Sequence, residues 1–174
     1  MTDAPDELWA VSGELHPLLL EADRPSMESA AQNWKEHGLA VGVVFGGKAR
    51  TLHGLYAEFA SALKFPDYFG QNRDAFDECI ADLEGLATGS GYVVLIAEPD
   101  KMLIDSPDAD FEWLVISLSR AAREYGHPIS QGEPWDRPAI PFHVVLTGEW
   151  EVLERARLRW AMAGAEPVVM GRPR

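Results

Sequence analysis

Cysteine, long apolar runs and basic residues are all scarce in this sequence of 174 residues. The single cysteine, Cys79, excludes a disulfide within the chain. No apolar run approaches the roughly 18 residues that a membrane span needs, and the acidic N-terminus lacks the charge pattern of a signal peptide. We therefore expect a cytoplasmic protein that does not contact membranes.

The shortage of positive charge bears on the kind of partner. Lysine and arginine number 15 against 28 aspartates and glutamates, which gives a formal net charge of −13. Most of the excess lies in residues 1–36, 65–86 and 98–112. Because nucleic-acid phosphates would be repelled, we expect no direct nucleic-acid binding and favour a basic protein partner. Acidity also aids solubility, and this explanation stays open.

Common signatures of catalysis are missing as well. Neither GxxxxGK[ST] nor GxGxxG is present, and Ser90 stands in TGSGY rather than in a GxSxG nucleophile elbow. Asp74 and Glu78 could in principle serve acid/base chemistry, but an outward-facing helix offers no pocket to tune them. The five histidines are too far apart for HxxxH or HxH metal spacing: His16, His37, His53, His127 and His143. We expect no enzyme, no catalytic residue, no metal and no cofactor.

What the sequence does contain is an alternation of strands and helices. Continuous apolar runs predict buried strands at 39–45, 92–97 and 142–146, with short strands at 15–20 and 168–170. Apolar residues at helical spacing predict helices that begin after the N-caps Ser26, Thr51 and Asn72, and two more at 111–125 and 149–163. Continuous apolar strands separated by helices indicate an α/β fold with a mostly parallel sheet of three to five strands.

One segment concentrates charge around an aromatic-glycine loop. Residues 65–86, FPDYFGQNRDAFDECIADLEGL, hold one basic residue, Arg73, and six carboxylates: Asp67, Asp74, Asp77, Glu78, Asp82 and Glu84. At about 100° per residue, an apolar stripe forms on one side of the helix, made of Phe76, Cys79, Ile80 and Leu83. Asp74 and Glu78 point away from that stripe, about 6 Å apart along the helix. Their like charges repel, and a cationic partner would relieve the repulsion.

Acids on an amphipathic helix are often only its solvated face, and Asp74 also suits the positive end of the helix dipole. The loop before the helix favours a second interpretation. Tyr68 and Phe69 directly precede the acids, and aromatics beside charges are common at protein interfaces. Gly70 is expected to permit the turn into the helix.

The order of residues in this segment resembles the barstar family of intracellular ribonuclease inhibitors. The family pattern is Pro-Asp/Glu-Tyr-aromatic-Gly-x-Asn, followed by Asp-Ala-x-x-Asp/Glu-Cys-Leu. This chain matches it without gaps at Pro66, Asp67, Tyr68, Phe69, Gly70, Asn72, Asp74, Ala75, Glu78, Cys79 and Ile80. The resemblance covers residues 39–147 and implies a barstar-like fold. In the family, the loop and the short acidic helix plug the active site of a guanyl-specific ribonuclease.

The resemblance implies a partner-binding surface made of Tyr68, Phe69, Gly70, Asn72, Arg73, Asp74, Asp77 and Glu78. Its carboxylates would meet the cationic side chains that otherwise bind RNA phosphate. The expected partner is a basic protein, a secreted or toxic ribonuclease, and the unbound chain is expected to be a monomer. An immunity or adaptor protein that binds another basic protein through the same surface is the alternative.

Three departures from the best-known family member bear on the choice of partner. Asp77 replaces an aromatic residue, Glu78 replaces the more familiar aspartate, and Ala121 stands where a further carboxylate is used, with Glu124 the nearest substitute. The rest of the chain is expected to form a single domain, 1–174, with this core. Residues 1–38 would add a strand-helix extension with a frayed first dozen residues, and 148–174 a helix and tail. The helix at 149–163 either mediates dimerisation or covers the sheet, and we expect the cover.

Overall fold

The computed structural model describes residues 4–83, 85–86 and 90–171, so Glu84 lies outside the described part of the acidic segment. The strands are β1 (Leu18–Glu21), β2 (Ala40–Phe45), β3 (Tyr92–Ala97), β4 (Phe142–Gly148) and β5 (Val168–Val169). The α-helices are α1 (Arg24–Glu36), α2 (Leu52–Leu63), α3 (Arg73–Ala81), α4 (Asp108–Tyr125) and α5 (Trp150–Met162). Short 3-10 helices are η1 (Asp6–Trp9), η2 (Gly46–Lys48) and η3 (Pro99–Lys101).

The strands form one sheet in the order β2-β3-β4-β1-β5, and every pair in it is parallel. β3 pairs with β2 on one side and with β4 on the other along its whole length. β1 lies against β4 with Leu18 opposite Val145, and β5 adds to the outer edge of β1. The predicted α/β fold with a sheet of three to five strands is therefore confirmed, and the sheet has five strands.

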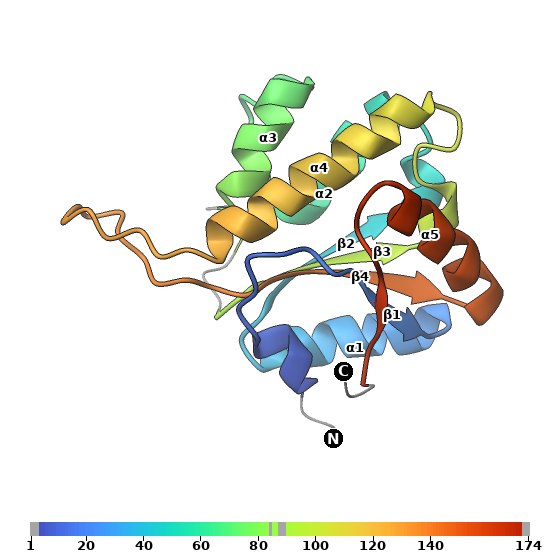
Figure 1. The fold of residues 1–174 in the computed structure, drawn as a ribbon, viewed down its shortest axis with the longest axis horizontal. Helices are drawn as coiled ribbons and strands as arrows, with labels where there is room; N and C mark the ends of the chain where they lie inside the picture. The colour runs from blue at the N-terminus through green and yellow to red at the C-terminus, as the bar shows by residue number, and fades with distance from the viewer. Residues whose placement is uncertain (1–3, 84, 87–89, 172–174) are drawn as a thin grey trace.

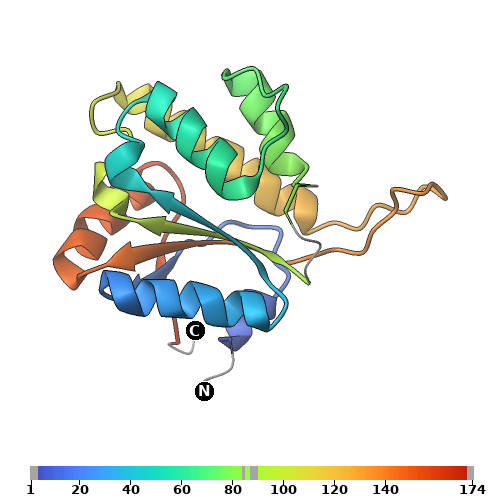
Figure 2. The same ribbon diagram turned by 180° about the vertical axis from the view of Figure 1, so that it is seen from behind.

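Helices cover the sheet on both faces (Figures 1 and 2). Side chains alternate along β3, so that Val93 and Leu95 face α1 while Val94 and Ile96 face the opposite core. α1 and η1 close the first face, and α2, α4 and α5 close the second. α3 lies outside that second layer and packs on α4 (Figure 1). This position leaves one side of α3 open to solvent.

Arginines fasten α5 to the rest of the molecule. Arg155 pairs with Asp100 in η3, with a nitrogen-oxygen distance of 2.9 Å. Arg159 donates hydrogen bonds to the backbone carbonyls of Met102 and Leu103 and stacks on the Phe111 ring. The inner face of α5 is buried: Leu153, Ala156 and Trp160. The helix thus covers the sheet, as expected.

Two expectations for the N-terminal region were wrong. Residues 4–12 are not frayed, because Leu8 of η1 is fully buried in the core and the Glu7 carboxylate accepts a hydrogen bond from the Gly171 amide. The N-cap of α1 is Asp23 rather than Ser26, since the Asp23 carboxylate accepts from the Ser26 amide. Pro25 fits the first turn of the helix, where its missing N–H costs nothing. The helix therefore begins earlier than the apolar spacing indicated.

Candidate functional site

The loop between α2 and α3 is shaped by two residues in the left-handed conformation. Lys64 ends α2 with φ of 56°, and Gln71 turns the chain into α3 with φ of 48°. Gly70 is not in that conformation, so its predicted role in the turn needs correction. A Cβ at Gly70 would lie 3.1 Å from the Asn72 side-chain nitrogen, and glycine therefore leaves room for the helix cap.

Asn72 is the N-cap of α3, as predicted. Its side-chain oxygen accepts from the Ala75 amide at 2.9 Å, and its side-chain nitrogen donates to the Gly70 carbonyl at 3.3 Å. The two bonds fix the first turn of the helix to the loop before it. Because both are made inside the chain, the Asn72 side chain orients the loop.

The two loop aromatics have different environments. Tyr68 is 86% exposed. Phe69 is half-buried and packs edge-on against Tyr56 and Phe65, with ring centroids 5.9 Å and 5.1 Å apart. Of the predicted pair, only Tyr68 is mostly exposed to solvent. Phe69 instead packs the loop against the body of the protein.

Arg73 is engaged within the chain. Its guanidinium pairs with the Asp110 carboxylate at the start of α4 and lies over the Trp113 ring, 5.1 Å from the centroid. Asp110 is buried. The interaction neutralises a charge on each helix and joins the first turn of α3 to the first turn of α4.

Asp77 is also held by α4. Its carboxylate accepts a hydrogen bond from the Ser117 hydroxyl and lies 3.6 Å from an Arg120 nitrogen. Asp77 is half-buried and Ser117 is buried. Asp77 therefore contributes to the contact between α3 and α4.

Asp74 and Glu78 differ from Asp77. Both are exposed on the outer side of α3, as the helical wheel predicted. Within the described ranges, neither carboxylate has an ion-pair or hydrogen-bond partner. Asp82, just past the end of the helix, is exposed beside them. We call these three residues, Asp74, Glu78 and Asp82, the acidic face.

The core side of α3 is as predicted: Phe76, Cys79, Ile80 and Leu83 are all buried. Burial, together with the nearby Glu78 and Asp82 carboxylates, raises the pKa of the Cys79 thiol. A raised pKa keeps the thiol protonated at neutral pH, which suits a packing role rather than a nucleophile.

Tyr125 anchors the far end of α3. Its hydroxyl donates to the Ile80 carbonyl at 3.1 Å and accepts from the Leu83 amide at 3.2 Å. Burial of this side chain raises the pKa of the Tyr125 hydroxyl. α3 is thus tied to α4 at its start, its middle and its end, and the acidic face is held on a rigid support.

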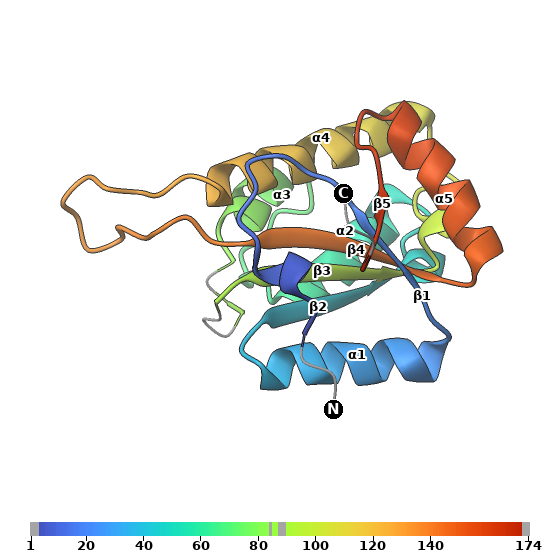
Figure 3. The same cartoon turned by 60° about the horizontal axis from the view of Figure 1, so that its bottom comes forward.

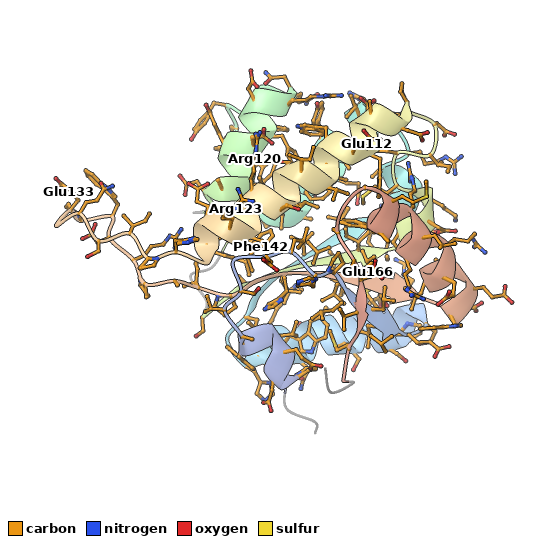
Figure 4. The ribbon with its side chains drawn as sticks, viewed as in Figure 1. Glu112, Arg120, Arg123, Glu133, Phe142 and Glu166 are labelled. Carbon is orange, nitrogen blue, oxygen red and sulfur yellow. The ribbon has the colours of Figure 1, made fainter. Side chains whose placement is uncertain are left out.

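An open groove of about 430 Å³ runs between α3 and α4, next to the acidic face. Arg120 of α4, labelled in Figure 4, lines this groove together with four carboxylates. The lining residues are Asp77, Glu78, Ala81, Asp82, Ser117, Arg120, Ala121 and Glu124. The groove therefore carries four carboxylates and one cation, and it extends from the acidic face to Glu124.

The α4 partners of the site were not predicted. They are Asp110, Trp113, Ser117 and Arg120, spaced three or four residues apart. This spacing forms a second helical stripe beside the apolar one, and it is the sequence pattern from which these residues could have been found. Which helix it faces depends on tertiary packing.

Two further findings concern sites of other kinds. Among the residues that the structure describes, no group of three or more His, Cys, Asp or Glu side chains could hold a metal ion. A helix long and apolar enough to cross a membrane is likewise not found in these described ranges.

Comparison with solved structures shows the fold. Cdc6p from Pyrobaculum aerophilum matches with a TM-score of 0.51 and 13% identity, over 90% of this chain and 40% of that one. The ORC2 protein of Aeropyrum pernix, solved as ADPNP-ADP complexes, matches with a TM-score of 0.50 and 10% identity, over 90% of this chain and 42% of that one. This chain thus spans less than half of either protein, and identities this low carry the fold alone. No curated protein matches the chain.

A family model gives the more specific result. The model described as Barstar (barnase inhibitor) matches residues 39–147, the range over which the loop and acidic helix resemble that family. The match includes β2, β3 and all but the last residue of β4, the helices α2, α3 and α4, and the whole of the loop, acidic face and groove. The chain belongs to the barstar family.

Proposed function

We propose that this protein inhibits a guanyl-specific, barnase-like ribonuclease by covering its active site with the loop before α3 and the acidic face. The observation that carries the proposal is the contrast among the charges of α3. Arg73 and Asp77 are engaged by α4, whereas Asp74 and Glu78 are exposed and have no ion-pair partner within the described residues. Carboxylates held ready on a rigid helix suit a cationic active site.

The roles of the proposed contact residues follow from their positions. Asp74 and Glu78 would accept hydrogen bonds from the arginine, lysine and histidine side chains that bind RNA phosphate. Tyr68 would supply an exposed aromatic contact, as aromatic residues often do at the centre of interfaces. Phe69, Gly70 and Asn72 would hold the loop in shape, and Arg73 and Asp77 would hold the helix.

Inhibition of RNA cleavage tests the proposal. The purified chain is titrated into a panel of guanyl-specific ribonucleases, with barnase as the first member. We expect stoichiometric inhibition of at least one enzyme, and its loss in the double variant Asp74→Ala, Glu78→Ala. Glu112→Ala, which removes an exposed carboxylate of α4, is the control for a general charge effect. An inactive wild-type chain across the panel and at every salt concentration would overturn the proposal.

A different basic partner is the second candidate, favoured by one observation. Asp77 replaces the interface aromatic of the best-known member. Its carboxylate accepts a hydrogen bond from Ser117 and pairs with Arg120 within the chain. If affinity isolation from cells recovers a basic protein without nuclease activity, and recovery depends on Asp74 and Glu78, the partner is of this second kind.

A further inference from the structure

The chain between α4 and β4 forms an arm that projects from the body of the molecule (Figures 1 and 3). The arm comprises residues 126–141, and Glu133 lies at its tip (Figure 4). Connections longer than about 12–15 residues without secondary structure are uncommon in compact domains and are often functional. The proposed role of the acidic face does not explain why the chain has this arm.

The base of the arm is fixed to α4. Ile129 and Arg137 exchange backbone hydrogen bonds of 2.8 Å and 3.0 Å across the arm. The Arg137 guanidinium lies over the Tyr125 ring, 5.1 Å from its centroid, and donates to the carbonyls of Glu124, His127 and Pro138. The arm consequently leaves the body in a defined direction.

The tip is a preformed turn. The Asp136 carboxylate accepts hydrogen bonds from the Gln131 and Gly132 amides at 2.7–3.0 Å, and these bonds hold the pKa of that carboxyl below its usual value. Gly132 adopts φ of 80°, a left-handed conformation that suits glycine. A turn fixed in this way loses little conformational entropy when a partner binds.

Trp135 is held on this turn and is 61% exposed. Tryptophan is enriched among the few residues that carry most of the binding energy of protein interfaces. In the part of the chain that the structure describes, Trp135 belongs to neither of the two buried core clusters. Its neighbour Glu133 is exposed too, and gives the tip the same sign of charge as the acidic face.

We propose that the arm is a second contact for the same basic ribonuclease, with Trp135 as its apolar anchor. This inference rests on the proposed function. The two surfaces are continuous, because Glu124 lines the groove beside the acidic face and its carbonyl accepts from Arg137 of the arm. Seven extended residues reach roughly 20 Å, while a standard interface of about 800 Å² per partner is roughly 30 Å across. One partner can therefore contact the arm and the near end of the acidic face, Glu78 and Asp82, because Tyr125 joins that end of α3 to the base of the arm.

Binding of variants to the ribonuclease that the wild-type chain inhibits most tightly tests the arm. We expect Trp135→Ala to weaken binding at least tenfold, mainly through faster dissociation, and Trp135→Phe to have an intermediate effect. Leu158→Ala is the control, since Leu158 is 66% exposed but lies on α5. It should bind within twofold of the wild type. All variants are compared by circular dichroism and thermal unfolding to exclude misfolding.

The remaining outcomes separate this inference from the proposed function. If the wild-type chain binds the ribonuclease and Trp135→Ala binds within twofold of it, the arm proposal is overturned and the inhibitor function stands. If the wild-type chain binds no ribonuclease, both fail. If the free wild-type chain is a dimer by light scattering and Trp135→Ala is a monomer, the arm contacts a second copy, and the proposal is likewise overturned.

Discussion

The Arg73 guanidinium at the first turn of α3 pairs with the Asp110 carboxylate at the first turn of α4. This pair stands directly beside Asp74, the first residue of the acidic face. Because Asp110 is buried and Arg73 also lies over Trp113, the interaction fixes where α3 begins. Presentation of the free carboxylates thus depends on a pair that belongs to the fold.

Removal of the Asp110 carboxylate should lower the free energy of unfolding more than it lowers the affinity for the ribonuclease. We expect Asp110→Ala to reduce the free energy of unfolding by about 1–2 kcal/mol, because it breaks a charged hydrogen bond of which one partner is half-exposed. Arg73→Ala should cost about the same, and the double variant less than the sum of the two. Urea unfolding measures all three. Fully additive costs would show that the two side chains do not interact.

Asp77 and Glu78 are neighbours in sequence with opposite expected roles. Asp77→Ala should lower the free energy of unfolding by about 1 kcal/mol, since the hydroxyl of buried Ser117 loses its acceptor. Glu78→Gln should leave stability within about 0.5 kcal/mol of the wild type, as for most surface substitutions, yet weaken ribonuclease binding at least tenfold.

Parallel calorimetry of unfolding and binding separates these two roles. Asp74→Gln is a useful companion to Glu78→Gln, because it removes the other free carboxylate of the acidic face. Comparable loss of affinity in Asp77→Ala and Glu78→Gln, at unchanged stability, would place Asp77 in the interface and contradict the assignment.

Tyr125 should make stability depend on alkaline pH. An ordinary tyrosine has a pKa of about 10. Burial raises the pKa of Tyr125 in the folded chain, so the unfolded chain loses this proton first. The stabilisation is therefore fully present below about pH 10 and is lost as pH rises toward the folded-state pKa.

Tyr125→Phe tests this dependence. At pH 8 the variant should be about 1–2 kcal/mol less stable, because the buried Leu83 amide loses its acceptor. Between pH 8 and pH 11 the gap between variant and wild type should narrow. Tyr56, whose pKa is also raised by burial, is present in both proteins and cancels in the comparison. A gap that stays constant over this range would contradict the account.

The positions of the strands β2, β3 and β4 and the two sides of α3 could be predicted because both depend on local patterns. Continuous apolar runs located β2, β3 and β4, and a helical wheel separated buried Phe76 from exposed Asp74. Whether each carboxylate is paired within the chain or free could not be predicted in this way. Asp77 and Glu78 are adjacent carboxylates, and only the position of Ser117 on another helix distinguishes them.

Long-range placement explains the other differences. The first dozen residues were expected to be frayed because chain termini usually are. In the described part of this segment, however, Leu8 is buried in the core and the Glu7 carboxylate accepts a hydrogen bond from the amide of Gly171, far along the chain. The location of β1 between β4 and β5 is likewise determined by tertiary packing. Nothing in the local sequence of residues 18–21 specifies it.

We propose that residues 1–174 fold as one unit, and deletion of residues 1–38 tests it. β1 would be lost from between β4 and β5, and α1 from the face formed by Val93, Leu95 and Val145. Because these side chains would meet water, residues 39–174 should bind a hydrophobic dye, lose near-ultraviolet circular dichroism and unfold without a cooperative transition.

A point substitution gives a graded version of the same test. Trp34 of α1 is buried against this face, and Trp34→Ala should lower the free energy of unfolding by about 3–5 kcal/mol, as large-to-small changes of buried aromatics do. It leaves the acidic face unaltered, so the fraction that remains folded should still inhibit the ribonuclease. Cooperative unfolding of residues 39–174 at the wild-type midpoint would show instead that the family core is stable without its N-terminal extension.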